Sequence, residues 1–428
     1  MRLLAGRLQS QLAGTSFHPS PLSTRAVRGP HVSEIIMDKR LLVLASGMFS
    51  IGTDSFVVAG ILPQVSASLG APPALAGQMV TLYALSYALL SPVIAAVAAH
   101  WPRKQLLLAG LGVFILANMG TALAPNIEVV LATRLLAGLG AAMFSPTATA
   151  TGASLVAPEM RGRALAVIVA GLSSATALGA PMGTFIGGWL GWRATMWFVA
   201  VIGAVAAISL ARLLRDVPTL PALSLSRRLA PLGDGRVLLT LTTTWLACAG
   251  LFLVYTYIGL SFDRATGGDA RVLAVLLLLW GAAATVGNLL AGRLTDRFGS
   301  RRIINAAIAI VAIDFALLPV TSASLVTAVP ALLVWGLCGW GLLVPQQHRL
   351  ISITPASSPL LLGLNSAAIY IGVSMSGVLG GAAITWFDRH VLGLVGAPFI
   401  VVSLLAAEWA HRRIRQPSLV PAETITAP

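Results

Sequence analysis

The stretch GMFSIGTDSFVVAGILP, residues 47–63, carries a single carboxylate, Asp54, in a run of otherwise uncharged and mostly apolar residues. Together with the apolar residues on either side, the run is long enough for a helix that crosses a bilayer, which needs about 20 such residues. An ionisable side chain inside such a helix costs free energy and by default marks a functional site. The stretch therefore predicts a membrane-spanning helix in which Asp54 has a function.

The composition extends this prediction to the whole chain. Of the 428 residues, 57% are hydrophobic and only 10% are charged, which is more apolar side chain than a water-soluble domain can bury. Uncharged stretches of spanning length recur from Leu41 to Ala407. We therefore predict an all-α polytopic membrane protein.

The apolar runs predict twelve transmembrane helices, which we expect at 41–64, 75–99, 105–124, 128–157, 164–188, 193–214, 237–262, 271–294, 303–322, 326–348, 359–386 and 391–410. The net charge of +14 could indicate a nucleic-acid partner. However, the basic residues lie in short gaps between apolar runs, where they set membrane topology. We expect a lipid bilayer and no nucleic acid as the chain's surroundings.

The basic residues are distributed unevenly between the two sides of the membrane. Alternate gaps collect Lys39, Arg40, Arg103, Lys104, Arg161, Arg163, Arg215, Arg227, Arg228, Arg236, Arg297, Arg301, Arg302, Arg349, Arg412, Arg413 and Arg415. The other gaps hold Arg193, Arg264, Arg271 and Arg389. Because positive loops stay inside, we expect both termini in the cytoplasm and the protein in the cell (inner or plasma) membrane.

The chain contains an internal repeat, which consists of two sets of six spans. GAPMGTFIGG (179–188) aligns with GVSMSGVLGG (372–381), and AAVAAHWPRK (95–104) aligns with GRLTDRFGSR (292–301) at nearly the same offset. The longest internal gap, rich in Pro, Ser and Arg, divides the sets. We predict a six-helix bundle over 37–214, a cytoplasmic linker over 215–236, a second bundle over 237–411 and a cytoplasmic tail over 412–428.

The first 36 residues differ from the rest because they are rich in Ser, Pro and Arg and have no spanning run. We expect a disordered tail or an upstream start codon, since MDKRLLVLASGMF from Met37 already reads as a basic flank followed by a span. A transit-type presequence is the alternative. A chain that starts at Met37 is expected to insert like the full chain.

Two buried charges are expected at similar depth. Asp54 lies about ten residues from the outer end of the first span, and Arg134 lies about seven residues from the outer end of the fourth, or roughly 15 and 10 Å of helix rise. Each alone would be costly in hydrocarbon, so we expect both to face the interior and to neutralise each other. The pair either locks two helices or exchanges a proton during function.

The segment GRLTDRFGSRR (292–302) resembles the motif between paired spans of the major facilitator superfamily. Physically, Gly292 lets helices approach, Asp296 can cap a helix or pair with a cation, and Gly299 makes the turn. The basic residues Arg297, Arg301 and Arg302 hold the cytoplasmic face. The first-half counterpart lacks the aspartate, so we expect any charged contact that holds one conformation of the protein (a charge latch) in the second half.

Other segments resemble further motifs of the superfamily. RLLAGLGAA (134–142) is similar to its fourth-helix motif, which implies a role for Arg134 in proton transfer. GAPMGTFIGG is similar to its fifth-helix antiporter motif, with Pro181 and Gly188 matched and Ala180 in place of a glycine. Gly179, Gly183 and Gly187 recur every four residues and leave one helix face bare. Plain close packing is the alternative reading of that face.

The resemblance is closest to the drug:proton antiporter branch that includes sugar-efflux and chloramphenicol-resistance proteins. It implies two pseudo-symmetric six-helix bundles and a central cavity, for which we expect Gln78, Tyr255, Tyr257, Asn365 and Tyr370 as lining candidates. Relatives often carry the first-helix acid one position later, where this chain has Ser55. Asp314, in the middle of the ninth span, has no assigned role.

We predict a secondary active transporter that exports small molecules such as drugs or sugars in exchange for protons. The alternative is a proton symporter or facilitator for uptake of a metabolite. A membrane enzyme would need a cluster of His, Cys or carboxylate groups at depth, and a receptor would not need the repeat. We expect no cofactor, no metal, no disulfide between Cys248 and Cys338, and a monomer.

Overall fold

A computed structural model describes residues 39–215, 217 and 224–415. The predicted tail at 1–36, the linker residues 216 and 218–223, and residues 416–428 lie outside the described residues. In the described part, twelve helical segments are long and apolar enough to cross a membrane. All regular structure there is helical. The predicted all-α fold with twelve spans is therefore confirmed.

Nine of the spans contain one principal helix each, which in the second span follows the short helix α3 (Pro73–Ala76). In the other three spans, further helical pieces adjoin the principal helix. The unbroken spans are α2 (Lys39–Leu69), α4 (Gln78–Val97), α5 (Arg103–Ala122), α6 (Ile127–Ser154), α9 (Trp192–Leu213), α11 (Gly235–Thr256), α14 (Ala270–Phe298), α15 (Ser300–Thr321) and α18 (Ser358–Trp386). The remaining spans are α7 (Arg161–Ser174) with η3 (Ala175–Gly179) and α8 (Ala180–Leu190), α16 (Leu325–Gly341) with α17 (Leu343–Ile353), and α19 (Leu392–Arg415) with a preceding turn at Arg389–Val391.

Short helices connect several of these spans. They are α3 (Pro73–Ala76) before α4, α10 (Leu225–Leu229) before α11, and α12 (Ile258–Ser261) with α13 (Asp263–Thr266) before α14. The seventh span, expected to run to residue 262, ends at Thr256 because Tyr257 leaves the helical region with φ −112° and ψ 24°. Gly299 has φ 81° in the turn between α14 and α15, a conformation that favours glycine.

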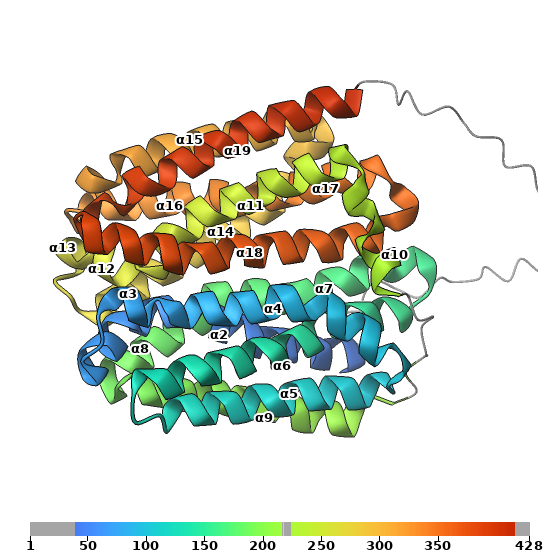
Figure 1. The fold of residues 1–428 in the computed structure, drawn as a ribbon, viewed down its shortest axis with the longest axis horizontal. Helices are drawn as coiled ribbons and strands as arrows, with labels where there is room; N and C mark the ends of the chain where they lie inside the picture. The colour runs from blue at the N-terminus through green and yellow to red at the C-terminus, as the bar shows by residue number, and fades with distance from the viewer. Residues whose placement is uncertain (1–38, 216, 218–223, 416–428) are drawn as a thin grey trace, which may run out of the picture. The chain divides into compact units, whose positions relative to one another are not determined.

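The helices form two groups of six spans (Figure 1). The first group runs from α2 to α9, where α5 packs on α6 and α9. The second group runs from α11 to α19, where α11 packs on α18 and α19. The groups meet mainly through two pairs of helices, α4 with α18 and α8 with α14. This pairing brings both halves of the repeat to one central surface.

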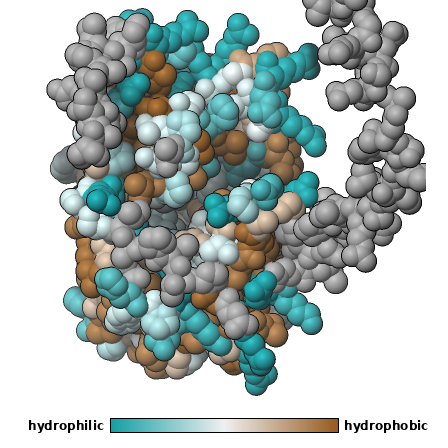
Figure 2. Space-filling view, turned by 90° about the vertical axis from the view of Figure 1, so that its right-hand side faces the viewer, coloured by the Kyte–Doolittle hydropathy of each residue, from teal (hydrophilic) through white to brown (hydrophobic). Residues whose placement is uncertain are grey.

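The two ends of the helices differ in what they carry. At one end lie α3, α12 and α13, which we call the α3 end (Figure 1). At the other, the arginine-rich end, lie α10, the start of α15 with Arg301 and Arg302, and the last turn of α19 with its three arginines. Figure 2 looks onto the arginine-rich end, where hydrophilic side chains gather around the edge. The charge asymmetry of the sequence therefore corresponds to two physically distinct faces.

Candidate functional site

The site is built on Asp54 of α2 and Arg134 of α6, which form a buried ion pair. Arg134 Nη1 donates to Asp54 Oδ1 at 2.8 Å. The two residues are 1% and 0% exposed. Such a pair must be well hydrogen-bonded to persist away from water, because both ions lose their hydration. The juxtaposition agrees with the similar depths expected from the sequence.

Helix α5 holds the guanidinium of Arg134 from its other side. Arg134 Nη2 donates to Asn118 Oδ1 at 2.8 Å and to Thr121 Oγ1 at 3.0 Å. Both acceptors are fully buried. The sequence reasoning missed them, although two polar residues three apart in an apolar span share one helix face and could have indicated a partner.

The ion pair is incompletely satisfied. Asp54 Oδ2 and Arg134 Nε are buried and have no hydrogen-bond partner among the described residues. A carboxylate has room for several hydrogen bonds, so the second oxygen of Asp54 is a free acceptor. The contact to Arg134 therefore leaves acceptor capacity on this carboxylate unused.

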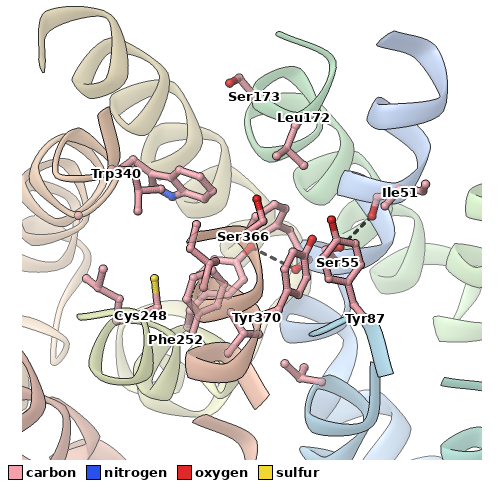
Figure 3. Close-up of a pocket in the computed structure, with 18 of the residues that line it drawn as sticks. Ile51, Ser55, Tyr87, Leu172, Ser173, Cys248, Phe252, Trp340, Ser366 and Tyr370 are labelled. Atoms are coloured by element: carbon pink, nitrogen blue, oxygen red, sulfur yellow. Dashed lines mark hydrogen bonds between the residues drawn. The ribbon is translucent and has the colours of Figure 1, made fainter. Parts of the chain in front are cut away.

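Asp54 borders a central cavity of about 260 Å³ that both groups of helices line. Figure 3 shows Tyr87 and Tyr370 side by side with Ser55 next to them, and Trp340 across the space. The rings of Tyr87 and Tyr370 stack at 3.9 Å, and Ser55 Oγ donates to Tyr83 OH at 3.0 Å. Hydroxyl groups thus line this part of the cavity.

The opposite wall of the cavity is aromatic. Trp280, Trp335 and Trp340 come from α14 and α16, and Phe252 and Tyr255 come from α11. Phe56, two residues after Asp54, joins them with its ring 5.6 Å from that of Trp340 and 5.8 Å from that of Tyr255. The helix that carries the carboxylate therefore also contributes to the aromatic wall.

The five predicted lining candidates occupy different places. Tyr255 and Tyr370 line the cavity. Gln78 and Tyr257 lie toward the α3 end, where Gln78 Nε2 and Tyr257 OH both donate to the carbonyl of Gly377, at 3.3 and 2.7 Å. Asn365 accepts from Thr244 Oγ1 at 3.0 Å, between α18 and α11. The last three are thus used in contacts between helices.

Contacts between the two groups close the cavity toward the α3 end. Gln78 belongs to the first group and Gly377 to the second, so their hydrogen bond crosses the interface. A methyl group added at Gly381 would lie 3.1 Å from the Ala74 Cα, and one at Gly259 would lie 2.9 Å from Pro63. One at Gly188 would lie 2.9 Å from Ala270. The helices on this side are therefore packed so closely that glycine is needed at these contacts.

The glycines of the antiporter-like segment pack against the helix that carries Asp54. Gly179, Gly183 and Gly187 face the α2 residues Thr53, Val57 and Ile61, respectively, which are also spaced four apart. Pro181 is buried in α8 between these glycines. The segment begins in η3, which is a π-helical stretch. Such stretches are frequent at functional sites. The bare helix face that the sequence predicts is thus covered by α2.

The segment 292–302 shows a different arrangement from the one expected. Asp296 is exposed and has no hydrogen bond or ion pair with a described residue, and no atom lies within 4 Å of a methyl group added at Gly292. Arg301 instead pairs with Glu408 of α19 through hydrogen bonds of 2.9 and 2.6 Å. Asn305 also donates to Glu408.

The other basic residues of this segment remain at the surface. Arg297 is exposed with its guanidinium 5.1 Å from the ring centre of Phe298, and Arg302 is also exposed. Asp314 is 8% exposed, and its Oδ2 has no partner among the described residues. Within the described ranges no group of three or more His, Cys, Asp or Glu could hold a metal ion. Both cysteines are free thiols.

Comparisons with known proteins agree on one family. The model described as Major Facilitator Superfamily matches residues 44–355. The chain is similar to the uncharacterized MFS-type transporter YbcL of Bacillus subtilis, 27% identical over 86% of this chain and 94% of that protein. It is also similar to a chloramphenicol resistance protein of Streptomyces lividans, 36% identical over 60% of this chain and 67% of that protein.

Solved structures give the same fold. A bacterial homolog of the human lysosomal transporter Spinster, in an inward-facing and unoccupied conformation, has a TM-score of 0.67 at 17% identity, covering 89% of this chain and 97% of that one. The nucleoside transporter NupG has a TM-score of 0.72 at 14% identity, covering 87% and 98%. At these identities the likeness concerns the fold alone.

Proposed function

The chain belongs to the Major Facilitator Superfamily, and from this premise we propose that it exports small molecules across the cell membrane in exchange for protons, with Asp54 as the proton carrier. That it is a small-molecule transporter follows from the family. The direction of transport, the proton coupling and the role of Asp54 are the proposal.

One observation carries the proposal: the buried pair of Asp54 and Arg134 has a free carboxylate oxygen, and Asp54 borders the central cavity. Protonation of Asp54 removes its charge and weakens its attraction for Arg134. A ligand in the cavity favours the ionised carboxylate if it donates a hydrogen bond to it. Proton and substrate can therefore compete at one residue, which is the requirement for exchange.

The arrangement of the two ends is compatible with export. The positive-inside rule assigns the arginine-rich end to the cytoplasm and the α3 end to the outside. Because the α3 end is closed by contacts such as Gln78 to Gly377, the cavity would receive its ligand from the cytoplasm. In this state Asp54 is paired with Arg134, which is the arrangement that the proposed cycle requires after the proton has left.

The proposed cycle then needs one rearrangement between two states. Substrate binding from the cytoplasm favours opening of the α3 end, where the higher outside proton concentration protonates Asp54 and the substrate leaves. The protonated form returns and loses its proton inside. The cycle requires no catalytic residue or cofactor, and a single chain contains both bundles, so we propose a monomer.

Transport in membrane vesicles tests the proposal. In inverted vesicles that hold an acidic interior, a transported drug is expected to accumulate inside, and an uncoupler is expected to abolish accumulation. Loss of the substrate from such vesicles along the proton flux would instead favour the uptake symporter. Accumulation that an uncoupler leaves unchanged would contradict proton coupling.

A further inference from the structure

A cluster of charged side chains lies at the α3 end, away from the central cavity. It joins α13, in the connection between α11 and α14, to η6 (Arg389–Val391), the turn between α18 and α19. His390 Nε2 lies 2.7 Å from Asp263 Oδ1, and His390 Nδ1 lies 2.6 Å from Asp388 Oδ1. Arg389 Nη2 pairs with the other oxygen of Asp263 at 2.8 Å. Two consecutive residues of the turn therefore hold one carboxylate of α13.

Both ring nitrogens of His390 face a carboxylate oxygen, and this determines how many protons the ring must carry. An ionised carboxylate can only accept hydrogen bonds, so each contact requires an N–H on the ring. A neutral imidazole has one N–H, whereas a histidinium has two. The two contacts are therefore both hydrogen bonds only when His390 is protonated. Loss of one proton leaves a nitrogen lone pair facing a carboxylate oxygen.

The charges of the cluster lead to the same requirement. Arg389 balances one of the two carboxylates, Asp263 and Asp388, so a histidinium makes the cluster neutral and a neutral ring leaves one excess negative charge. The His390 side chain is 15% exposed, so water compensates for little of this excess. The backbone N–H of His390 donates to Asp388 Oδ1 at 2.7 Å and holds the pKa of that carboxyl below its usual value. Asp388 therefore stays ionised while histidine titrates, between about pH 5 and 8.

The elements that pack on the turn contribute no further charge at this place among the described residues. Helix α12 has no acidic or basic residue, and neither have residues 392–407 of α19. The one acid of α15, Asp314, lies about two turns before the end of that helix. Arg264 of α13 donates instead to the Pro319 carbonyl at 2.7 Å. The charge of the cluster thus changes with the protonation of His390.

Helix α12 connects this cluster to the closure of the α3 end. It packs on η6 and also on α2, which belongs to the other group of helices. Ser261 Oγ of α12 donates to the Arg389 carbonyl at 3.4 Å, and a methyl group added at Gly259 would lie 2.9 Å from Pro63 of α2. Asp263 follows α12 after one residue. Contacts that hold Asp263 on the turn therefore also hold α12 against α2.

We propose that Asp263, Asp388 and His390 form a proton-operated clasp, which closes when His390 is protonated and then stabilises the closed α3 end. Both bonds of the clasp are present at acidic pH and one is lost as the pH rises, so its contribution to closure is largest at low pH. The placement of this end on the outside rests on the proposed function. In the proposed cycle, outside acid protonates Asp54, and the same acid closes the clasp. External acidity thus favours the return step over reopening.

A buried reporter at the α3 end tests the clasp. Ala76 of α3 is fully buried, and α3 packs on α18 of the other group, so a cysteine there should react when this end opens. The full chain with Ala76→Cys, Cys248→Ser and Cys338→Ser is placed in right-side-out vesicles with equal pH on both sides and no substrate. A membrane-impermeant maleimide is added outside, and the labelling rate is measured at about pH 6 and about pH 8, on either side of the usual histidine titration.

The variant His390→Gln is compared with this reporter chain at each pH, because the ratio of their rates cancels the pH dependence of the maleimide reaction. Glutamine is uncharged and offers a single nitrogen, so it cannot make both contacts at either pH. We expect His390→Gln to label severalfold faster at the acidic pH and at nearly the same rate at the alkaline pH. The control Arg264→Gln removes a bond of α13 that does not titrate, so its ratio should be equal at both pH values. An equal ratio at both pH values for His390→Gln would overturn the clasp.

The variant Asp388→Asn gives a test of opposite sign that a merely destabilised protein would not pass. Its amide can donate to the neutral ring, so at the alkaline pH this variant should label more slowly than the reporter chain. Faster labelling there would overturn the clasp. Labelling in inverted vesicles alone would overturn the outer placement. Neither substrate nor a proton gradient is present, so failure of proton-coupled export in the vesicle assay would leave these results standing.

Discussion

At the scale of single residues, Asp54 is the ion-pair partner of Arg134 and also lines the central cavity. Replacing it with asparagine keeps the shape but leaves Arg134 buried without its counter-ion. Loss of one partner of a buried pair costs about 3–5 kcal/mol, so the folded fraction is expected to fall. Export driven by a proton gradient should be abolished even after correction for folded protein in the membrane, because asparagine carries no exchangeable charge.

The double variant Asp54→Asn with Arg134→Gln separates a functional pair from a purely structural one. Removing both charges should restore much of the stability, since no uncompensated ion remains. We expect the double variant to fold yet remain uncoupled from the proton gradient. Recovery of active export in vesicles would mean that the pair only joins α2 to α6.

Thr121 offers a milder test of how α5 holds the arginine. The change Thr121→Val preserves volume but removes the acceptor at 3.0 Å from Arg134 Nη2. Hydrogen bonds to charged groups contribute about 1.5–3 kcal/mol, so the Tm should fall measurably in a thermal unfolding assay. Thr149→Val serves as control, because among the described residues the Thr149 hydroxyl bonds only to the carbonyl of Ser145 in its own helix. Equal effects of both changes would argue against a special role for Thr121.

The sequence could predict the pair but not its surroundings. Apolar runs fix the approximate depth of Asp54 and Arg134, and two charges at equal depth have few alternatives to each other. Asn118 and Thr121 were missed because their pairing depends on the rotation of α5 about its axis, which the run of apolar residues leaves open. The different positions of Tyr255 and Tyr257 depend likewise on the end of α11 at Thr256.

At the scale of helices, close contacts across the interface depend on glycine. A methyl group at Gly281 of α14 would lie 2.5 Å from the carbonyl oxygen of Thr176 and 2.7 Å from Ala177 Cα, in the π-helical segment η3. Backbone atoms cannot move away as a flexible side chain can. Gly281→Ala should therefore destabilise this packing by about 1–3 kcal/mol and slow transport.

The control for Gly281 is Gly292→Ala in the same helix, where a methyl group would meet no atom within 4 Å. Thermal unfolding and vesicle transport of the two variants should differ clearly, with Gly292→Ala close to wild type. A normal Tm and transport rate for Gly281→Ala would show that α14 can shift away from η3 at no cost.

At the arginine-rich end, two substitutions are expected to affect stability and transport differently. Glu408 contacts Arg301 and Asn305, so Glu408→Gln should lower stability by about 1 kcal/mol, as expected for a partly exposed pair. Asp296 has no partner among the described residues, so Asp296→Asn should leave Tm unchanged here. If Asp296 pairs only after the rearrangement, its loss should slow transport. Unchanged transport would remove the expected latch.

Helix ends show where sequence reasoning reaches its limit. Twelve apolar runs gave the correct number of spans because the bilayer demands about 20 apolar residues for each. Apolar runs do not reveal where a helix is interrupted, and the breaks at η3 and at Leu342 lie inside such runs. Glu408 was not recognised, because its pairing with Arg301 depends on how α15 packs on α19.

At the scale of the whole molecule, the two groups of helices line one central cavity, which Asp54 borders. The internal repeat predicts the bundles, but it does not say at which end they touch. That depends on contacts such as Gln78 with the Gly377 carbonyl, whose residues lie in separate halves of the repeat. The contacts at the α3 end and the pair of Asp54 and Arg134 together correspond to one state of the proposed cycle.

The proposed exchange requires that Asp54 carries the proton that is exchanged for substrate. The most direct measurement is proton release when a transported compound is added to the purified full chain in lightly buffered detergent, compared between wild type and Asp54→Asn at equal folded concentration. Protons should be released from wild type and none from Asp54→Asn. Absence of release from wild type despite binding, or equal release from both proteins, would contradict the proposed exchange.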